Sequence, residues 1–357
     1  KAYKCYCTQE ELENARKEAI ANKQTPKYNR KCRNLKTELN KPFTIRLKTE
    51  QTGITKFNDL IQGSCEVNNQ YMDDMILMRS NGTATYMLSV VVDDHDMKIS
   101  HVIRGTEHLN NAYRQIQIYK ACDWKIPEFA HVSLIHAEDG SKLSKRTGAK
   151  SVEEYQKEGF LKEAILNYLL RLGWSYGIEE IISINECIKI FDIKDVRSSA
   201  ARFSLSKLMN INAFYINALN DKTLYEKVRL FSNKEYEKEG VERIMKAMPY
   251  IKCRSRTIEE LSLMCDMFGN GNNHFGKIEK TEWIEKIIKE AENNPWKENE
   301  AKEWLNNFAK NNNKKIKEIG PILRKALTKS EVAPGIFDIF NILKPELTIK
   351  RLKNALS

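Results

Sequence analysis

The sequence predicts an α/β region followed by an all-α region. Between Tyr86 and Gly105, two apolar runs of strand length flank a polar turn, and apolar residues at helical spacing come next. From Val152 onward, apolar residues recur at helical spacing almost throughout. A strand, a turn, a second strand and a helix are typical of a nucleotide-binding α/β sheet, in which ligands bind at the carboxyl ends of the strands.

The composition indicates a globular intracellular protein. The chain has 357 residues, 41% hydrophobic and 30% charged, so it should form two or three packing units, since single cores rarely exceed ~250–300 residues. Lysine and arginine number 59 against 48 acidic residues, a net charge of +11 that favours a polyanionic partner such as nucleic acid. A genome of low GC content, whose codons favour lysine and asparagine, would produce a similar excess of basic residues without a functional reason.

Cysteine usage and hydropathy bear on the compartment. Eight scattered cysteines fit a reduced cytosolic protein better than a disulfide framework. No apolar run approaches the ~20 residues of a membrane span, and the polar first residues do not form a secretory signal. We therefore expect a cytoplasmic protein that does not contact a membrane.

The first segment places three cysteines in a pattern that suits a structural metal. Cys5 and Cys7 share one tight turn, and Cys32 follows after 24 residues, as in a zinc knuckle. A fourth ligand is missing from its expected place, because Asn34 rather than a histidine stands two residues beyond Cys32. The family resemblance given below makes Tyr28 a candidate phenolate ligand, so the expected Zn²⁺ set is Cys5, Cys7, Cys32 and Tyr28. The alternative is three ordinary reduced thiols left from a degraded site.

Local patterns predict the neighbouring elements. Thr8 is a suitable N-cap for a helix over 9–22, with acidic residues in its first turn. Residues 42–71 read as a small region of strands punctuated by Pro42, Gly53 and Gly63.

The next stretch brings polar residues to the end of a predicted strand. We expect a strand over 86–92, a turn over 93–96, a second strand over 99–103 and then a helix capped by Thr106. Arg104, Glu107 and His108 would then lie near a strand end and a helix N-terminus, where side chains converge on a ligand. Taken one at a time, these residues have simpler explanations: Asp93 and Asp94 favour a turn, and His108 would be an ordinary surface histidine.

A basic, glycine-containing loop follows residue 136. The chain should turn at Asp139 and Gly140, and Lys142, Lys145 and Arg146 then stand among hydroxyl-bearing residues. Cations, hydroxyls and a flexible backbone suit the binding of a polyphosphate whose charge shifts during reaction. A solvated basic loop is the simpler alternative.

The remainder is predicted to be helical. One helix should span 152–174, and two later helices each gather their apolar residues on one face. Those faces comprise Trp283, Ile284, Ile287, Ile288 and Ala291, and then Ala301, Trp304, Leu305 and Phe308. Lys252, Arg254 and Arg256 form a basic cluster beside another predicted helix, although most lysines of this half are expected to be merely solvated.

These motifs resemble a known enzyme family. The run Lys142-Leu143-Ser144-Lys145-Arg146 is similar to the KMSKS signature of class I aminoacyl-tRNA synthetases. Residues 90–121 and 129–175 resemble bacterial glutamyl-tRNA synthetase almost without a break. The similarity covers essentially the whole chain, although it is thin between about 206 and 315.

The resemblance implies a glutamate–tRNA ligase. Such an enzyme joins L-glutamate to ATP, with Mg²⁺, as glutamyl-adenylate, and transfers the acyl group to the 3′ end of tRNA(Glu). Tyr86 and Arg104 match the positions that hold glutamate, the arginine pairing with its side-chain carboxylate. The nucleotide positions are matched by Glu107, His108, Lys142, Leu143, Ser144, Lys145 and Arg146. Lys145 and Lys142 would be catalytic, and we expect a monomer.

The resemblance also implies a division of the chain. Residues 1–85 would belong to an acceptor-stem-binding insertion, and 86–136 to the second half of the Rossmann-type catalytic domain. Residues 137–205 would form the KMSKS-type loop with stem-contact helices, and 206–357 the α-helical anticodon-binding domains, in which Arg254 and Arg256 contact tRNA.

One family motif is absent. These enzymes carry a HIGH-type histidine motif near the start of the nucleotide fold, and the 357 residues do not contain one. We therefore expect the chain to be the C-terminal part of a longer protein and not to activate an amino acid by itself. A tRNA-binding protein without catalysis and a glutamyl-queuosine-type tRNA-modifying enzyme are the alternatives. The sequence leaves open whether tRNA(Gln) is charged as well.

Overall fold

The computed structural model describes residues 1–143, 150–174 and 177–356. The chain forms two compact units. Unit 1 comprises Lys1–Leu143 with Leu170–Glu179 and Asn185–Phe203, and unit 2 holds the other described residues. The divisions after residues 85, 136 and 205 remain predictions. Within the described ranges, none of the helices combines the length and apolarity that a bilayer crossing requires.

Unit 1 begins with an antiparallel sheet and one exposed helix. Strands β1 (Ala2–Cys5), β2 (Thr44–Leu47) and β5 (Ile76–Met78) form the sheet in the order β1-β2-β5. Helix α1 (Gln9–Ala21) starts at Thr8, whose hydroxyl accepts from the amide of Glu11 while the Glu11 carboxylate accepts from the amide of Thr8. The predicted cap is confirmed, because this reciprocal pair satisfies two amides that a helix start leaves open.

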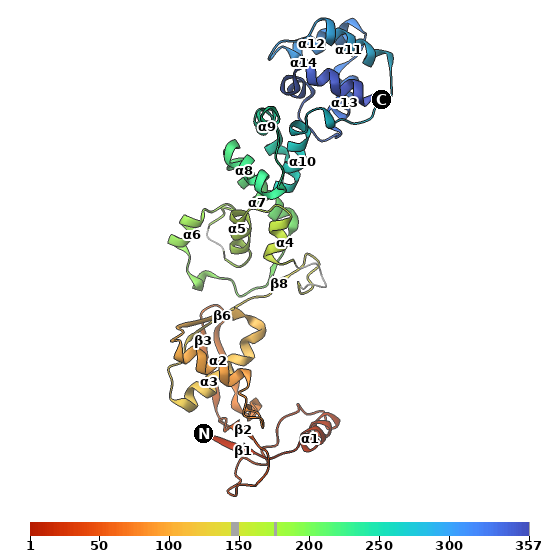
Figure 1. Ribbon diagram of the computed structural model, residues 1–357. Coiled ribbons are helices and arrows are strands. Elements are labelled where there is room, and N and C mark those ends of the chain that lie inside the picture. Colours follow the sequence, from red (N-terminus) through yellow and green to blue (C-terminus); the bar gives the residue numbers. More distant parts are fainter. Residues whose placement is uncertain (144–149, 175–176, 357) are drawn as a thin grey trace. The chain divides into compact units, whose positions relative to one another are not determined.

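A second sheet contains parallel strands, whose carboxyl ends form the candidate ligand site described below (Figure 1). Its order is β4-β3-β7-β6, from β3 (Ile54–Asp59), β4 (Gly63–Asn68), β6 (His101–Gly105) and β7 (Glu128–Val132). Strands β3 and β4 form an antiparallel hairpin, whereas β7 runs parallel to both β3 and β6. The strands predicted within 42–71 therefore divide between two sheets.

Helices cover one face of this sheet, and one of them was predicted wrongly. Residues 86–92, expected as a strand, open helix α2 (Tyr86–Asp96). A short apolar run does not reveal its period, and here the acidic residues expected to form a turn complete the helix instead. Its apolar side joins a core containing Val91, Ile118 and Tyr119. Helix α3 (Leu109–Cys122) follows a short 3₁₀ turn, η2 (Thr106–His108), so Thr106 lies in that turn rather than capping α3.

The chain then reaches the basic loop through a short strand. Strand β8 (Ile135–His136) pairs in parallel with β9 (Ala201–Arg202). The turn predicted at Asp139 and Gly140 is confirmed: Gly140 has φ +85°, and the Ser141 amide donates to the Asp139 carboxylate at 2.8 Å. This left-handed conformation favours glycine.

The helix predicted over 152–174 is in fact two helices. Helix α4 (Val152–Lys157) and helix α5 (Lys162–Gly173) are separated at Gly159, which has φ +80°. A Cβ atom at Gly159 would lie 2.5 Å from the backbone nitrogen of Glu259. The break therefore results from a left-handed backbone in tight contact with another segment of unit 2. Two short elements follow, α6 (Ile184–Ile190) and the 3₁₀ turn η4 (Ile193–Asp195).

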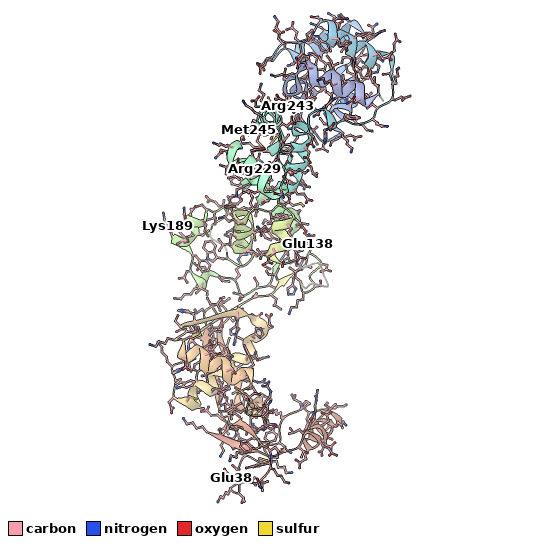
Figure 2. The ribbon with its side chains drawn as sticks, in the orientation of Figure 1. Glu38, Glu138, Lys189, Arg229, Arg243 and Met245 are labelled. Atoms are coloured by element: carbon pink, nitrogen blue, oxygen red, sulfur yellow. The ribbon has the colours of Figure 1, made fainter. Side chains whose placement is uncertain are left out.

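The rest of unit 2 is helical, as predicted. Its helices are α7 (Leu205–Ala218), α8 (Asp221–Ser232), α9 (Lys238–Ile251), α10 (Ile258–Gly269), α11 (Glu282–Asn293), α12 (Ala301–Asn311), α13 (Ile316–Thr328) and α14 (Ile336–Ala355). The predicted apolar faces of α11 and α12 are largely buried. Arg243, labelled in Figure 2, joins α9 to α10 by donating from Nε to the Phe268 carbonyl at 2.8 Å.

Arg351 holds the C-terminal helices together. Its guanidinium, fully buried, donates to the carbonyls of Met267 at 2.7 Å, Leu327 at 2.6 Å and Gly271 at 2.6 Å. These carbonyls belong to α10, to α13 and to the 3₁₀ turn η6 (Gly271–Asn273), while Arg351 lies on α14. One side chain thus satisfies acceptors from three separate segments.

We expect Arg351→Ala to lower the free energy of unfolding by about 2–4 kcal/mol, because buried carbonyls lose charged donors and a cavity is left. Denaturant unfolding followed by circular dichroism measures the change. The control is Lys350→Ala, at the exposed neighbouring position of the same helix, with an expected effect within ~0.5 kcal/mol. Equal midpoints for the two variants would contradict the role of Arg351.

Candidate functional site

The candidate site lies at the carboxyl ends of β3, β6 and β7. The parallel register pairs Arg104 of β6 with His131 of β7, and Asp59 is the last residue of β3. Three polar side chains from segments far apart in sequence therefore meet at one edge of the sheet. In open α/β sheets this edge is where ligands bind.

Asp59 and His131 form a buried pair. Both side chains are 0% exposed, and His131 Nδ1 lies 2.6 Å from Asp59 Oδ2. Asp59 Oδ1 accepts from the amides of Ile61, Gln62 and His131 at 3.0, 2.9 and 3.1 Å. Burial alone would raise the pKa of Asp59, but these amide hydrogen bonds and the contact with His131 outweigh it and lower the pKa. Asp59 is thus held as a carboxylate.

Arg104 is anchored to this pair. Its Nε donates to His131 Nε2 at 3.2 Å, and its Nη2 donates to Gln115 Oε1 at 2.8 Å and to the His108 carbonyl at 3.3 Å. The guanidinium also lies 5.7 Å from the ring centroid of Phe129. These contacts engage Nε and Nη2, so a ligand carboxylate would approach mainly through Nη1. A bidentate contact through Nη1 and Nη2 would displace the longest bond, the one to His108.

The structure brings Tyr86 to the same guanidinium. Burial lowers the pKa of Arg104, whereas interaction with Tyr86 and with Asp94 raises it. Tyr86 opens helix α2 and is 55% exposed, so its phenol remains accessible to a ligand beside Arg104. A positive charge flanked by a phenol suits an anionic ligand that also offers a hydrogen-bonding group.

Glu107 and His108 lie in the turn that follows Arg104. Both are exposed within η2, directly before helix α3. The Glu107 carboxylate lies over Gly105, where a Cβ atom would come within 2.2 Å of Oε2. The ring of His108 contacts the side chain of Asn111 at 3.4 Å. These two residues are therefore adjacent to Arg104, as the sequence predicted, and form the rim of the site.

The basic loop is described only in part. Lys142 pairs with His136 as an isolated bridge, and the Leu143 amide donates to the Ile135 carbonyl at 3.1 Å. Lys142 is exposed at this point. The predictions for Ser144, Lys145 and Arg146 concern residues that lie outside the described part of the chain.

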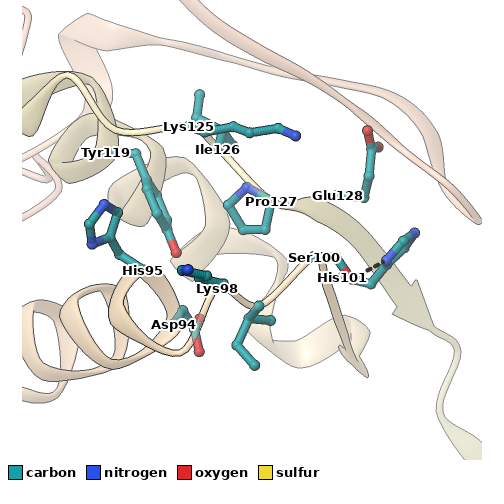
Figure 3. Close-up of a pocket in the computed structure, with 11 residues that line it drawn as sticks. Asp94, His95, Lys98, Ser100, His101, Tyr119, Lys125, Ile126, Pro127 and Glu128 are labelled. Carbon is teal, nitrogen blue, oxygen red and sulfur yellow. Dashed lines mark hydrogen bonds between the residues drawn. The ribbon is translucent and has the colours of Figure 1, made fainter.

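A separate cavity of about 440 Å³ opens at the other end of the same strands (Figure 3). It is lined by His101 and Glu128, which begin β6 and β7, and by Tyr119 of helix α3. The Tyr119 hydroxyl is buried without a hydrogen-bond partner in the described part of the chain, and burial together with Asp94 raises its pKa to about 12. Because the cavity lies at the amino ends of the strands, we do not assign the ligand to it.

The three predicted cysteine ligands do come together. The ligand atoms of Cys5, Cys7 and Cys32 all lie within 4.8 Å of one another, and Tyr28 Oη lies 3.2 Å from Cys5 Sγ and 3.7 Å from Cys7 Sγ. Burial would raise the pKa of Cys5, but hydrogen bonds involving Tyr28, the Cys7 backbone and Arg46 lower it to about 7. Burial raises the pKa of Cys7 to about 12. Three sulfurs and a phenol oxygen at these distances fit a single thiophilic metal ion.

The arginines predicted to contact tRNA follow helix α9. Arg254 is exposed and donates from Nη1 to the Tyr250 carbonyl. Arg256 is also exposed, but its backbone amide donates to the Glu260 carboxylate at 2.6 Å and its guanidinium lies 3.9 Å from the same group. Both cations are therefore exposed, and each has a partner close to it in sequence.

Sequence reasoning missed Asp59, His131 and Gln115. None of them belongs to a recognised motif. The contact that defines Asp59 and His131 joins two strands across a sequence separation of 72 residues, and Gln115 lies on helix α3, where it contacts Arg104. One signal was present: His131 interrupts an apolar run, and a histidine buried in a strand requires a polar partner.

Both the α/β part and the helical part of the chain match known protein families. Residues 1–210 match the family of class I tRNA synthetases for E and Q, catalytic domain, and residues 223–356 match an anticodon binding domain. The chain is 41% identical to glutamate–tRNA ligase 2 of Zymomonas mobilis, over 100% of this chain and 78% of the relative. It is 38% identical to glutamate–tRNA ligase of Thermodesulfovibrio yellowstonii, over 100% of this chain and 80% of the relative.

A solved structure shares the fold. It is a glutamate tRNA ligase from Elizabethkingia meningosepticum in complex with its amino acid, with a TM-score of 0.83 at 28% identity. The match covers 99% of this chain and 79% of that one. Mixed sheets followed by helices are thus the arrangement that this chain shares with a known enzyme.

Proposed function

The chain belongs to the glutamate–tRNA ligases of class I, and from this premise we propose that the protein activates L-glutamate with ATP and esterifies the 3′ end of tRNA(Glu). The observation that carries the proposal is the 41% identity that extends over all of this chain. The parallel strands β6 and β7, with Arg104 at their carboxyl ends, supply a site of the right polarity.

Arg104 is proposed to bind the side-chain carboxylate of glutamate, with Tyr86 beside it. The guanidinium is fixed by protein acceptors on Nε and Nη2, so its orientation is set before the ligand arrives. A fixed cation favours a carboxylate over the uncharged amide of glutamine, because the amide nitrogen would place donors against donors.

The nucleotide is proposed to bind between the turn after β6 and the basic loop. Glu107 and His108 would contact ATP, and Lys142, Leu143, Ser144, Lys145 and Arg146 would contact its phosphates. In this proposal Lys145 and Lys142 neutralise charge that develops on the phosphates during attack by the glutamate carboxylate. Mg²⁺ would accompany ATP and share that role.

The three cysteines and Tyr28 are proposed to bind zinc. The ion would tie the turn of Cys5 and Cys7 to Cys32, which are joined otherwise by weak sulfur contacts such as the 3.7 Å approach of Cys7 and Cys32. Its role in this position is structural, because the protein supplies four ligands.

The helical region is proposed to bind tRNA(Glu) and to read the anticodon. Residues 223–356 match an anticodon binding domain, and Arg254 lies exposed within that range. Arginine reads base edges well because it offers several donors in a fixed plane. We propose that the protein works as a monomer.

In the full-length protein we expect glutamate to be attached to tRNA(Glu), and Arg104→Ala to raise the KM for glutamate by ~10²-fold because a charged contact is lost. The KM for ATP should stay within about twofold, since the nucleotide uses other residues. Aminoacylation with labelled glutamate measures both constants. Arg114→Ala, at an exposed position on α3, is the matched control.

Absence of charging by the wild-type protein would refute the proposed function. Equal effects of Arg104→Ala on the two Michaelis constants would refute only the role of Arg104.

Purified chain is expected to carry about one zinc per molecule, and Cys32→Ser should lose most of it because one of few thiolate ligands is removed. Elemental analysis gives the ratio. Cys122→Ser, whose thiol is exposed and lies outside the cluster, should keep its zinc. Tyr28→Phe should weaken retention without abolishing it. Equal zinc contents in all four proteins would mean that the cluster is not a metal site.

Arg254→Gln should relax discrimination at the last anticodon base by roughly 1–3 kcal/mol, the scale of a single base contact. Filter binding with tRNAs that differ only at that base measures the change. Lys314→Gln, at an exposed position, should lower affinity slightly for every tRNA because it removes at most a phosphate contact. Unchanged discrimination in Arg254→Gln would show that another residue reads the base.

A further inference from the structure

A chain of hydrogen bonds runs from the end of β3 to the proposed glutamate site. Asp59 Oδ2 lies 2.6 Å from His131 Nδ1, and His131 Nε2 lies 3.2 Å from Arg104 Nε. The first two side chains are 0% exposed, so neither reaches the ligand itself. Their effect on binding must therefore pass through Arg104.

The chemistry of the groups fixes the direction of each bond. Arginine Nε carries a hydrogen and only donates, so His131 Nε2 must be an unprotonated acceptor. The proton of the neutral ring then lies on Nδ1 and is donated to Asp59 Oδ2. Asp59 holds the ring in the one neutral tautomer that accepts from Arg104.

Asp59 is itself unable to rotate. Its second oxygen, Oδ1, accepts from the backbone amides of Ile61, Gln62 and His131. Two of these amides belong to the turn between β3 and β4, and the third belongs to β7. Backbone amides from two separate segments thus hold the Asp59 carboxylate in place. Because its other oxygen contacts the His131 ring, the carboxylate also fixes the plane of the imidazole.

Gln115 provides a second anchor on the same guanidinium. Its Oε1 accepts from Arg104 Nη2 at 2.8 Å, and the side chain is 3% exposed. Its Nε2 is buried without a partner among the described residues, so the amide is oriented by Arg104 alone. With His131 on Nε and Gln115 on Nη2, the guanidinium plane is held at two points.

We propose that Asp59 and His131 are positioning residues that set the specificity of the proposed glutamate site, by locking the tautomer that orients Arg104 toward an anionic side chain. The inference rests on the proposed function, because it takes the ligand of Arg104 to be glutamate. Neither residue contacts the reacting atoms, so their loss should affect the binding of glutamate rather than that of ATP.

Asp59→Asn tests the lock directly. Asn keeps an oxygen for the backbone amides but places an NH₂ group opposite His131 Nδ1, which must then accept, and the ring proton moves to Nε2. Two donors would face each other at Arg104 Nε. We expect the KM for glutamate in the full-length protein to rise at least ~10-fold, with the KM for ATP within about twofold.

A spectroscopic readout separates the lock from a general loss of structure. With ¹⁵N-labelled histidine, the His131 ring should show the Nδ1–H tautomer in the wild type and the Nε2–H tautomer in Asp59→Asn. The His131→Gln spectrum assigns the signal by its disappearance. The Nε2–H tautomer in the wild type would overturn the proposal.

A matched pair of variants covers the case in which Asp59→Asn does not fold. His131→Gln places an oxygen near the position of Nε2 and keeps the acceptor for Arg104, whereas His131→Asn reaches only the position of Nδ1 and loses it. We expect the KM for glutamate to stay near the wild-type value in His131→Gln and to rise ~10-fold in His131→Asn. Equal constants in the pair would overturn the proposal.

Arg104→Ala distinguishes failure of this inference from failure of the proposed function. If Arg104→Ala raises the KM for glutamate but Asp59→Asn and His131→Asn do not, the positioning role is wrong while the glutamate site stands. If Arg104→Ala leaves the KM for glutamate unchanged, the assignment of Arg104 to glutamate is wrong, whatever the tautomer of His131.

Discussion

The contact between the buried Asp59 carboxylate and the His131 ring joins the strands on which the site depends. Asp59 ends β3, His131 lies on β7, and His131 is the register partner of Arg104 on β6. Parallel strands are joined by long crossover connections. Backbone pairing alone therefore does not determine which polar side chains meet at the carboxyl ends of these strands. A carboxylate and an imidazole are each costly to bury without a partner, so they favour the arrangement in which these two ends meet. The same arrangement places the guanidinium of Arg104 where a ligand can reach it.

The two ends of β6 and β7 differ in chemistry as well as in position. At the carboxyl ends, a fixed cation stands beside an exposed phenol and the start of helix α3. At the amino ends, the cavity is lined by the acidic Asp94 and Glu128 together with the basic Lys98 (Figure 3). Selection of an anionic amino acid requires the first kind of environment.

Local chemistry made part of this structure predictable. The Thr8 cap, the turn at Gly140 and the buried faces of α11 and α12 depend on residues within a few positions of one another, and the sequence shows those patterns directly. The run 86–92 was misassigned as a strand because a short and nearly continuous apolar run fits either period. Asp59 and His131 were missed because their meaning arises only when β3 pairs with β7 across 70 intervening residues. Arg104 was predicted from its place at a strand end and from the family resemblance, but the side chains that accept from its guanidinium, His131 and Gln115, were not predicted.

The central claim is that a pre-oriented Arg104 binds the side-chain carboxylate of glutamate. A crystal structure of the full-length protein with bound L-glutamate tests it most directly. The account predicts a carboxylate oxygen ~2.9 Å from Arg104 Nη1, the Tyr86 phenol beside the ligand, and the contact between Arg104 Nε and His131 Nε2 unchanged. A glutamate side chain bound away from Arg104, or an Arg104 that leaves His131 to reach it, would contradict the account.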